Sequence, residues 1–332
     1  MATNSAALGF AVWQNLTHVT TLTRVMRSTD PTFANVLASL RTRKSDAERA
    51  ADRAWLNSRV VSPTLTPPRN TLILVSTNFH RQRLNDACLR AHARSLNQPI
   101  YRLVADIGGV SQPLSHASRL DLFATPDSSS ERIPLFFDFT IGSPISLSKN
   151  RAPTAGEANG ARGIIRAVHW APGTTFNRAP DGTLTPSSLP LAIIIEPDLP
   201  RHHPLPHLPP TWYPVTRQTS EHLKVEFKDT FEGRNRSVTL TNITQIPMTL
   251  NYATTAYRVQ GQTVPSIFVA SWTSAPANFL YVAVSRVTSP DGVFLATAPP
   301  ARILRACGPS DDLIAEMDRL HREYGHNGNH TT

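Results

Sequence analysis

Cysteine is almost absent from this sequence, because Cys88 and Cys307 are the only two among 332 residues. They lie far apart and form no C-x-x-C pair, which excludes a disulfide framework and a thiolate metal site of the usual spacing. Long apolar runs are also missing, since the longest, residues 189–195 and 133–137, are too short to span a bilayer. The N-terminus lacks the charged start and apolar stretch of a signal peptide. We therefore expect a soluble protein with no membrane partner, in an intracellular location that is nuclear or mitochondrial if the source is a eukaryote.

Lysine is scarce too, because only four of the 33 basic residues are lysine and the others are arginine. This skew can reflect the base composition of the gene as well as a use for guanidinium groups. The net charge of +9 and the pI near 10.1 favour a polyanionic partner. Charge alone does not distinguish DNA from RNA or from an acidic protein. The length is enough for about two domains, and 40% hydrophobic residues are enough for a core.

Helix and strand signals alternate in the first third of the chain. Asp30 followed by Pro31 is typical of a helix start, and apolar residues recur at helical spacing up to residue 40. Ser45 and Glu48 have capping-box spacing. Further along, the pattern predicts a buried strand, a helix with Leu84, Cys88 and Ala91 on one face, and another strand, in residues 70–77, 80–96 and 100–106. This alternation indicates an α/β layer with a parallel sheet.

The middle of the chain has a different character. Residues 133–245 contain short apolar pieces separated by Gly, Pro and Asn turns, which predicts a small all-β insertion. Within it, the proline-dense residues 197–214 carry His202, His203 and His207 without cysteine or carboxylate partners, so a linker is favoured over a metal site. We therefore predict an α/β domain made of residues 1–132 and 246–305, an inserted β-rich domain at 133–245, and a flexible tail at 306–332.

Two stretches near the C-terminus carry polar residues between apolar flanks. "TTAYRVQGQT", residues 254–263, predicts a short helical turn, and its strand-like flanks, residues 246–253 and 266–271, predict one strand before it and one after it. Thr255 can cap the turn with its hydroxyl, and Gly261 can end it in the left-handed conformation. The simplest interpretation is a connection with a solvated Arg258. The second stretch, "NFLYVAVSRVTS", is compatible with a helix over residues 275–287 capped by Ser274, or with a strand.

Together the two stretches resemble the last motor motifs of the Pif/RecD-like branch of superfamily 1 helicases. Upstream segments are similar to the same family in the same order: "VTTLTRVMRSTDPTFANVLASLR", "NTLILVSTNFHRQRLND", "GSPISLSKNRAPTAGEANGARGII" and "TQIPMTLNYATTAYRVQGQT". The resemblance covers residues 12–298. This sequence departs from the family motif at Tyr257, Arg258 and Val259, which stand for histidine, lysine and serine, and at Ser28, which stands for glutamine.

The family's G-x-x-x-x-G-K-[ST] phosphate loop does not occur in this sequence. The resemblance therefore implies the second motor domain of an ATP-dependent 5′-to-3′ DNA helicase, with a P-loop-NTPase-like (RecA-like) α/β fold and an inserted small β-barrel. It implies ATP and Mg²⁺ as cofactors only together with a first motor domain, which is separate or encoded upstream. For the isolated chain we expect no cofactor and no catalysis.

The resemblance also implies roles for individual residues. Arg27 and Arg286 would be the catalytic arginines at the γ-phosphate, and Gln260 and Gly261 would adjoin the same nucleotide. We expect both guanidinium groups to face solvent on one side of the domain. The residues that would contact single-stranded DNA are Thr77, Asn78, Thr255, Tyr257 and Arg258.

Plainer interpretations stay open for these positions. Arg27 and Arg286 can be surface charges near helix ends, and Asn78 and Thr255 can be capping residues. The whole chain can likewise be a stand-alone nucleic-acid-binding module whose motor residues are relics.

Overall fold

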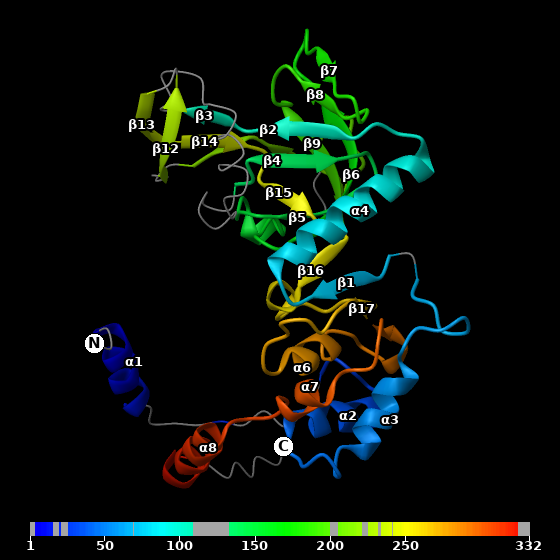
Figure 1. The fold of residues 1–332 in the computed structure, drawn as a ribbon, viewed down its shortest axis with the longest axis vertical. Coiled ribbons are helices and arrows are strands. Elements are labelled where there is room, and N and C mark those ends of the chain that lie inside the picture. The colour runs from blue at the N-terminus through cyan, green and yellow to red at the C-terminus, as the bar shows by residue number, and fades with distance from the viewer. Residues whose placement is uncertain are drawn as a thin grey trace. The chain divides into compact units, whose positions relative to one another are not determined.

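The computed structural model describes residues 4–15, 20, 26–68, 70–108, 133–199, 205–220, 225–231, 234–240 and 242–324 (Figure 1). The chain forms two compact units: Met1–Thr71 with Gln260–Thr332, here named the terminal unit, and Leu72–Val259, here named the central unit. The predicted boundaries at residues 132 and 245 came from changes in composition rather than from contacts, and they stay predictions. His202 and His203 lie outside the described residues.

The terminal unit combines helices with one pair of parallel strands. In the pair, Ile267 lies opposite Val293 and Val269 opposite Leu295, and all four side chains are buried. The helical elements are α1 (Asn4–Gln14), α2 (Pro31–Arg41), α3 (Ala50–Ser58), α6 (Phe279–Val284), η4 (Pro290–Gly292), α7 (Ala301–Arg305) and α8 (Asp311–Tyr324), and the strands are β17 (Ile267–Val269) and β18 (Val293–Leu295).

One of the two helix-start signals in the terminal unit is confirmed, and the other forms its contacts before the helix begins. Asp30 is the N-cap of α2, and its carboxylate accepts hydrogen bonds from the backbone N–H of Thr32 at 2.8 Å and of Phe33 at 3.2 Å. Ser45 and Glu48 form the capping-box contacts in both directions, at 2.7 Å and 3.4 Å, but a turn follows them and α3 begins only at Ala50. These local bonds satisfy N–H groups that have no partner inside a helix.

A buried ion pair lies at the start of α3. The side chain of Arg49 is fully buried, and its guanidinium donates to the Asp52 carboxylate at 3.2 Å and to the carbonyls of Thr42 and Cys307 at 2.9 and 3.0 Å. Ser39 Oγ donates to the other oxygen of Asp52 at 2.6 Å. Because Cys307 lies far along the chain from Arg49, this cation joins the two sequence segments of the terminal unit.

The second C-terminal stretch is a helix rather than a strand, but α6 is shorter than the predicted 275–287. Ser274 has a φ of 52°, and Asn278, at the N-cap position, has a φ of 61°. The expected Ser274 cap is therefore wrong, because an N-cap residue normally has extended backbone. Part of the expected tail, Asp311–Tyr324, forms α8 with Leu320 buried.

The central unit begins with a parallel pair of strands covered by a helix. In this pair, β1 (Leu72–Val75) lies beside β16 (Ala253–Thr255), with Val75 opposite Thr255. The helix α4 (Asn78–Leu96) begins after Thr77, its N-cap, and ends at Asn97 in the left-handed conformation. Packing of a helix on a parallel strand pair is the expected α/β arrangement.

The buried face of α4 differs from the predicted one. Ala91 is exposed, whereas Asn85 and Leu89 are buried. The polar Asn85 does not look like a buried position in the sequence. Its side-chain oxygen accepts from the Ala253 N–H, and its amide nitrogen donates to the Ala253 carbonyl, both at 2.9 Å. A buried polar side chain of this kind satisfies the unused backbone edge of β16.

The rest of the central unit is rich in β-structure. A five-stranded antiparallel sheet has the order β10-β9-β6-β5-β15, a four-stranded sheet β4-β2-β8-β7, a three-stranded sheet β11-β14-β3, and β12 pairs with β13. These elements are β2 (Tyr101–Val104), β3 (Asp106–Gly108), β4 (Phe136–Phe139), β5 (Pro144–Leu147), η2 (Pro153–Ala155), β6 (Arg162–His169), β7 (Phe176–Arg178), β8 (Leu184–Pro186), β9 (Ala192–Pro197), β10 (Tyr213–Thr216), β11 (Gln218–Thr219), β12 (Val225–Phe231), β13 (Arg234–Leu240), β14 (Asn242–Gln245), β15 (Met248–Leu250) and η3 (Ala256–Val259).

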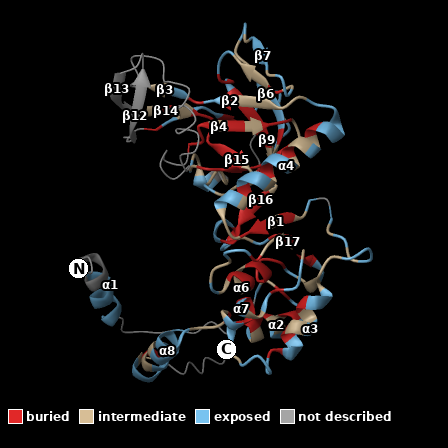
Figure 2. Ribbon diagram, in the orientation of Figure 1, coloured by how far each residue is buried: buried red, intermediate tan, exposed pale blue. Residues whose placement is uncertain are grey.

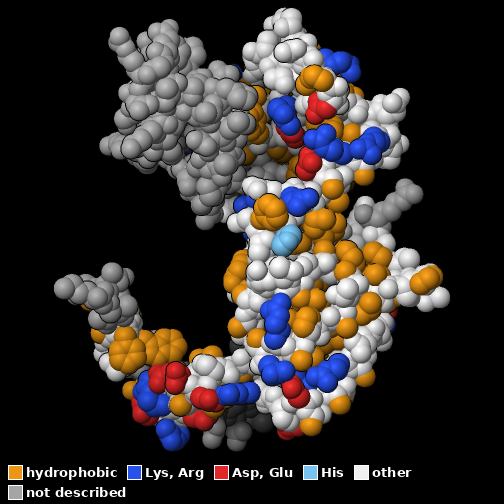
Figure 3. Space-filling model, in the orientation of Figure 1, with side chains coloured by type: hydrophobic (Ala, Val, Ile, Leu, Met, Phe, Trp, Pro, Cys, Tyr) orange, Lys and Arg blue, Asp and Glu red, His pale blue; other side chains and the backbone are white. Residues whose placement is uncertain are grey.

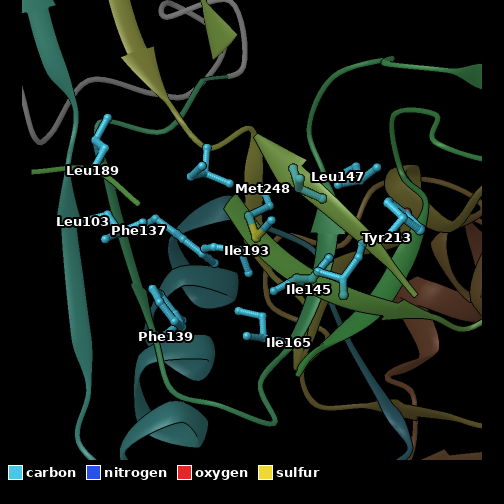
Figure 4. Packing of buried hydrophobic residues seen from close by; sticks show 13 residues of the cluster. Leu103, Phe137, Phe139, Ile145, Leu147, Ile165, Leu189, Ile193, Tyr213 and Met248 are labelled. Carbon is cyan, nitrogen blue, oxygen red and sulfur yellow. The ribbon is translucent and has the colours of Figure 1, made fainter. Parts of the chain in front are cut away.

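One apolar cluster fills the interior of these sheets (Figure 4). Buried residues gather between the strands, whereas the outer surfaces of the loops are exposed (Figure 2). The cluster consists of Leu103, Phe137, Phe139, Ile145, Leu147, Ile165, Leu189, Ile193, Ile195, Tyr213, Val215, Ile246 and Met248.

Two strand assignments differ from the sequence expectation. The strand expected at residues 100–106 in the parallel layer is β2, which pairs antiparallel with β4 and contributes Leu103 to the apolar cluster. The single strand expected before the polar turn is divided into β15 and β16 at Asn251 and Tyr252, and β15 pairs with β5. A short apolar run specifies burial but not its partner strand.

The fold class is nevertheless confirmed as α/β with parallel strands and β-rich additions. Among the described residues, the helices are all too short or too polar to traverse a lipid bilayer.

Replacing the buried cation tests its structural role. Arg49→Met leaves the Asp52 carboxylate buried without its cationic partner, so we expect the free energy of unfolding to fall by about 3 kcal/mol. The matched control is Arg43→Met. Arg43 forms an ion pair with Asp311, and the two side chains are 56% and 81% exposed. Its effect should stay below about 1 kcal/mol. Urea denaturation measures both, and equal losses would contradict the assignment.

Replacing Asn85 tests the attachment of α4 to β16. Asn85→Leu leaves the Ala253 N–H and carbonyl without their partner, and we expect a loss of about 2 kcal/mol in unfolding free energy. Amide hydrogen exchange at Ala253 should accelerate in parallel. Gln82→Leu, at an exposed position of the same helix, is the control and should change neither quantity; unchanged exchange at Ala253 in Asn85→Leu would refute this attachment.

Candidate nucleotide and nucleic-acid sites

Arg286 lies two residues after Val284, the last residue of α6, and its side chain folds back onto the end of that helix. Its Nε donates to the carbonyl of Val282 at 2.9 Å, and a terminal nitrogen donates to the hydroxyl of Ser285 at 2.7 Å. The last carbonyls of a helix have no intrahelical donor and carry partial negative charge, so a guanidinium is stabilised there. As a result Arg286 is only 9% exposed.

Arg27, near the other end of the sequence, also contacts Ser285. One of its terminal nitrogens donates to the carbonyl of Ser285 at 2.5 Å, and its Nε donates to the hydroxyl of Thr263 at 3.0 Å. Ser285 therefore accepts one hydrogen bond from each arginine, with its carbonyl and its hydroxyl. The structure brings together the two arginines that the sequence places far apart.

The expected orientation of the two guanidinium groups is only partly met. Arg27 is half-buried, whereas Arg286 is buried rather than directed to solvent. Burial lowers the pKa of Arg286, and the nearby positive charge of Arg27 lowers it further. Neither arginine forms an ion pair within the described part of the chain. Two adjacent cations without a carboxylate favour the approach of an anion.

The predicted turn residues directly precede a segment that contacts both arginines. Gly261 has a φ of 84° and ends the turn after η3, as the sequence predicts. Two residues later, Thr263 holds Arg27, and the N–H of Val264 donates to the Arg286 carbonyl at 3.0 Å. Gln260 and Gly261 are both exposed. The segment that contains them is thus attached to both arginines.

The second candidate site lies in the central unit, where β1 and β16 end. Because these strands are parallel and Val75 lies opposite Thr255, the residues that follow them emerge at one edge. Thr77 and Asn78 follow β1, and Tyr257 and Arg258 follow β16. We name the exposed face that these four residues form the strand-end face.

Hydrogen bonds hold the polar side chains of the strand-end face. Thr77 Oγ1 contacts His80 Nδ1 at 2.8 Å and accepts from the His80 N–H at 3.3 Å, which makes it the helix cap. Asn78 Oδ1 accepts from Arg81 Nε at 3.3 Å, and Arg258 donates to Thr249 Oγ1 at 3.4 Å. The capping interpretation therefore applies to Thr77 rather than to Asn78.

Aromatic exposure at the strand-end face is high. The Tyr257 side chain is 66% exposed, whereas Thr255 is 7% exposed at the end of β16. Phe79, which the sequence interpretation did not single out, is 61% exposed, and the Arg83 guanidinium lies 5.6 Å from its ring centroid. The signal was available, because Phe79 follows the polar break directly and lies off the apolar face of α4. Exposed aromatic rings beside arginine are suited to stacking on bases.

The described residues contain no group of three or more His, Cys, Asp or Glu side chains that could hold a metal ion. The arginine pair, by contrast, suits an anion such as phosphate, because two adjacent guanidinium groups can donate to its oxygens.

Solved structures that share this fold include Pif1 helicases. A Bacteroides Pif1 in complex with ADP-AlF3 and ssDNA has a TM-score of 0.61 and 18% identity, over 93% of this chain and 58% of its own. Another Bacteroides Pif1, bound to ssDNA, has a TM-score of 0.61 and 18% identity, over 92% and 57%. The Pif1 helicase from Candida albicans has a TM-score of 0.56 and 15% identity, over 90% and 60%.

No protein-family model and no curated protein matches the chain. The chain spans less than two thirds of the length of these helicase structures. At such low identity the likeness establishes the fold, which is that of somewhat more than half of a Pif1 helicase.

Proposed function

We propose that this chain is the second motor domain, with its inserted β-rich domain, of an ATP-dependent 5′-to-3′ DNA helicase of the Pif/RecD-like branch. The observation that carries the proposal is the meeting of Arg27 and Arg286 at Ser285 without a carboxylate partner among the described residues. The fold shared with Pif1 helicases supports it.

The two arginines act on the phosphates of ATP in this proposal. Guanidinium groups directed at the γ-phosphate stabilise the charge that develops as it is transferred. Arg27 stays on Thr263 and Ser285, whereas Arg286 exchanges its bonds to Val282 and Ser285 for a phosphate oxygen. The first motor domain supplies the phosphate loop and the ligands for Mg²⁺, which neutralises phosphate charge when bound. Gln260 and Gly261 adjoin the nucleotide through the segment that holds both arginines.

Single-stranded DNA binds at the strand-end face in this proposal. Thr77 and Asn78 offer a hydroxyl and an amide to phosphates, Arg258 adds a cation, and Tyr257 adds a ring for stacking. Phe79 joins them as a second exposed ring. Thr255 is buried, and it contributes by ending β16 at this edge. Its side chain contacts the DNA only after a local rearrangement.

A stand-alone nucleic-acid-binding module is the second candidate. It is favoured by the Arg286 side chain, which is satisfied by its own helix end, and by the lack of a phosphate loop in the sequence. The DNA sequence upstream of the coding region separates the two candidates. A G-x-x-x-x-G-K-[ST] loop and an Asp-Glu strand end encoded there favour the helicase.

The first prediction from the proposal concerns DNA affinity. The purified chain should bind a labelled single-stranded oligonucleotide weakly in fluorescence anisotropy, with an affinity that falls steeply as salt rises because counterions are released. Tyr257→Ala should weaken binding about fivefold by the loss of stacking. Arg258→Ala should reduce the slope of log affinity against log salt by about one.

The control for these variants is Arg217→Ala, an exposed arginine of the central unit that lies outside the strand-end face. It should change the affinity less than Arg258→Ala does. An affinity that is independent of salt, or equal losses in both arginine variants, would locate the binding surface elsewhere.

The second prediction concerns hydrolysis. The isolated chain should release no phosphate from ATP, with or without single-stranded DNA, because no phosphate loop positions the γ-phosphate. When the first motor domain is present in the same polypeptide, Arg286→Ala should lower DNA-stimulated turnover about 1,000-fold. Arg305→Ala, at the exposed end of α7, is the control and should leave turnover unchanged. DNA-stimulated turnover by the isolated chain, lost in Arg286→Ala, would place the whole nucleotide site in this chain.

A further inference from the structure

A groove opens in the central unit between α4 and the strands β4 and β15. Its volume is about 320 Å³, within the range of about 300–1,000 Å³ that is usual for small-molecule pockets. The lining comes from three segments: Arg81, Gln82, Asn85, Asp86 and Leu89 of α4; Pro134, Phe136, Phe137 and Asp138; and Met248, Thr249 and Leu250 of β15.

Two hydrogen bonds join residues that line the groove to residues of the strand-end face. Arg81, which lines the groove, donates to Asn78 of the face at 3.3 Å. Arg258 of the face donates to Thr249, which lines the groove, at 3.4 Å. A strand that lies over Asn78 and Arg258 therefore passes the groove opening.

The charges that line the groove are largely neutralised by neighbours. Asp138 accepts two hydrogen bonds from Arg102, at 2.8 and 2.6 Å, and Asp86 pairs with Arg90 at 3.1 Å. Figure 3 shows acidic and basic side chains beside one another in this part of the central unit. A lining with two carboxylates, each already paired with an arginine, does not favour a phosphate, so the groove differs in kind from the strand-end face.

The remaining lining suits a flat ring with polar edges. The half-buried Phe136 and Leu250 provide apolar surface, and the Arg102 guanidinium lies 5.8 Å from the centroid of the Phe136 ring. Gln82 is exposed on α4, where its amide can donate and accept. Apolar walls with a few polar groups at the rim are typical of pockets that bind heterocycles.

We propose that this groove receives one nucleobase of the bound single strand, turned out of the base stack. The inference rests on the proposed binding of single-stranded DNA at the strand-end face. It adds a base-binding subsite to that face: phosphates lie on Asn78 and Arg258, and one base enters the groove toward Phe136. A neutral amide rim accepts any base, so the subsite does not select a sequence.

The test is a scan of one oligonucleotide with a single abasic residue moved along it, at constant salt and constant phosphate number. Removal of the base that enters the groove should weaken binding about tenfold, because the contact of that base with the ring and the apolar walls is lost. In Phe136→Ala this abasic penalty should fall below about twofold. In Gln82→Ala, a change at an exposed position that does not endanger folding, the abasic penalty should fall to about threefold.

The matched control is Phe176→Ala, because Phe176 is 40% exposed and does not line the groove. It should keep the full tenfold penalty. An intact strand that binds with a flat abasic scan would overturn the base subsite and leave DNA binding in place. Absence of any binding to the intact strand would overturn the proposed function as well.

A second copy of the chain seated in the groove is the competing occupant. It would give a flat scan together with a monomer–dimer equilibrium that Phe136→Ala shifts, as measured by sedimentation, and this result would also overturn the proposal.

Discussion

The parallel pairing of Leu72–Val75 with Ala253–Thr255 is the interaction on which the strand-end face depends. These strands are separated in sequence by almost the whole β-rich region, so their pairing closes a very long loop. The register puts Val75 opposite Thr255, which aligns the two strand ends. Asn85 satisfies the backbone of Ala253 on the other side. A register shift by one residue would exchange which side chains are buried and which are exposed, and would remove Tyr257 and Arg258 from the face.

Four arginines of the described residues lie in three different environments, and the environment determines the role of each side chain. Arg49 is buried against Asp52 and connects the two sequence segments of the terminal unit. Arg102 is bound to Asp138 and lies over Phe136. Arg27 and Arg286 share Ser285 and have no carboxylate partner among the described residues. Of these four arginines, only Arg27 and Arg286 lack a carboxylate partner among the described residues, which suits an anionic ligand.

Contacts between segments distant in sequence explain two differences between the sequence prediction and the structure. The buried face of α4 includes Asn85, and a polar residue there displaces the expected apolar stripe by one position. The apolar character of residues 100–106 predicts a strand of the parallel layer, yet β2 pairs antiparallel with β4 and contributes Leu103 to the apolar cluster. Composition records that a segment is buried, whereas the partner strand depends on contacts that are distant in sequence.

Local features were determined by the sequence itself. The Asp30 cap, the Ser45 and Glu48 capping box, the left-handed Gly261 and the α/β class follow from short-range hydrogen bonding and residue pattern, and the structure has them. The order of the motifs indicated which arginines belong together. Tertiary structure alone decided that Arg27 and Arg286 meet at one serine, and that a groove adjoins the strand-end face. These features arise where segments distant in sequence pack together, and a sequence pattern records the hydrogen bonds and periodicity of its own segment but not the partner it meets.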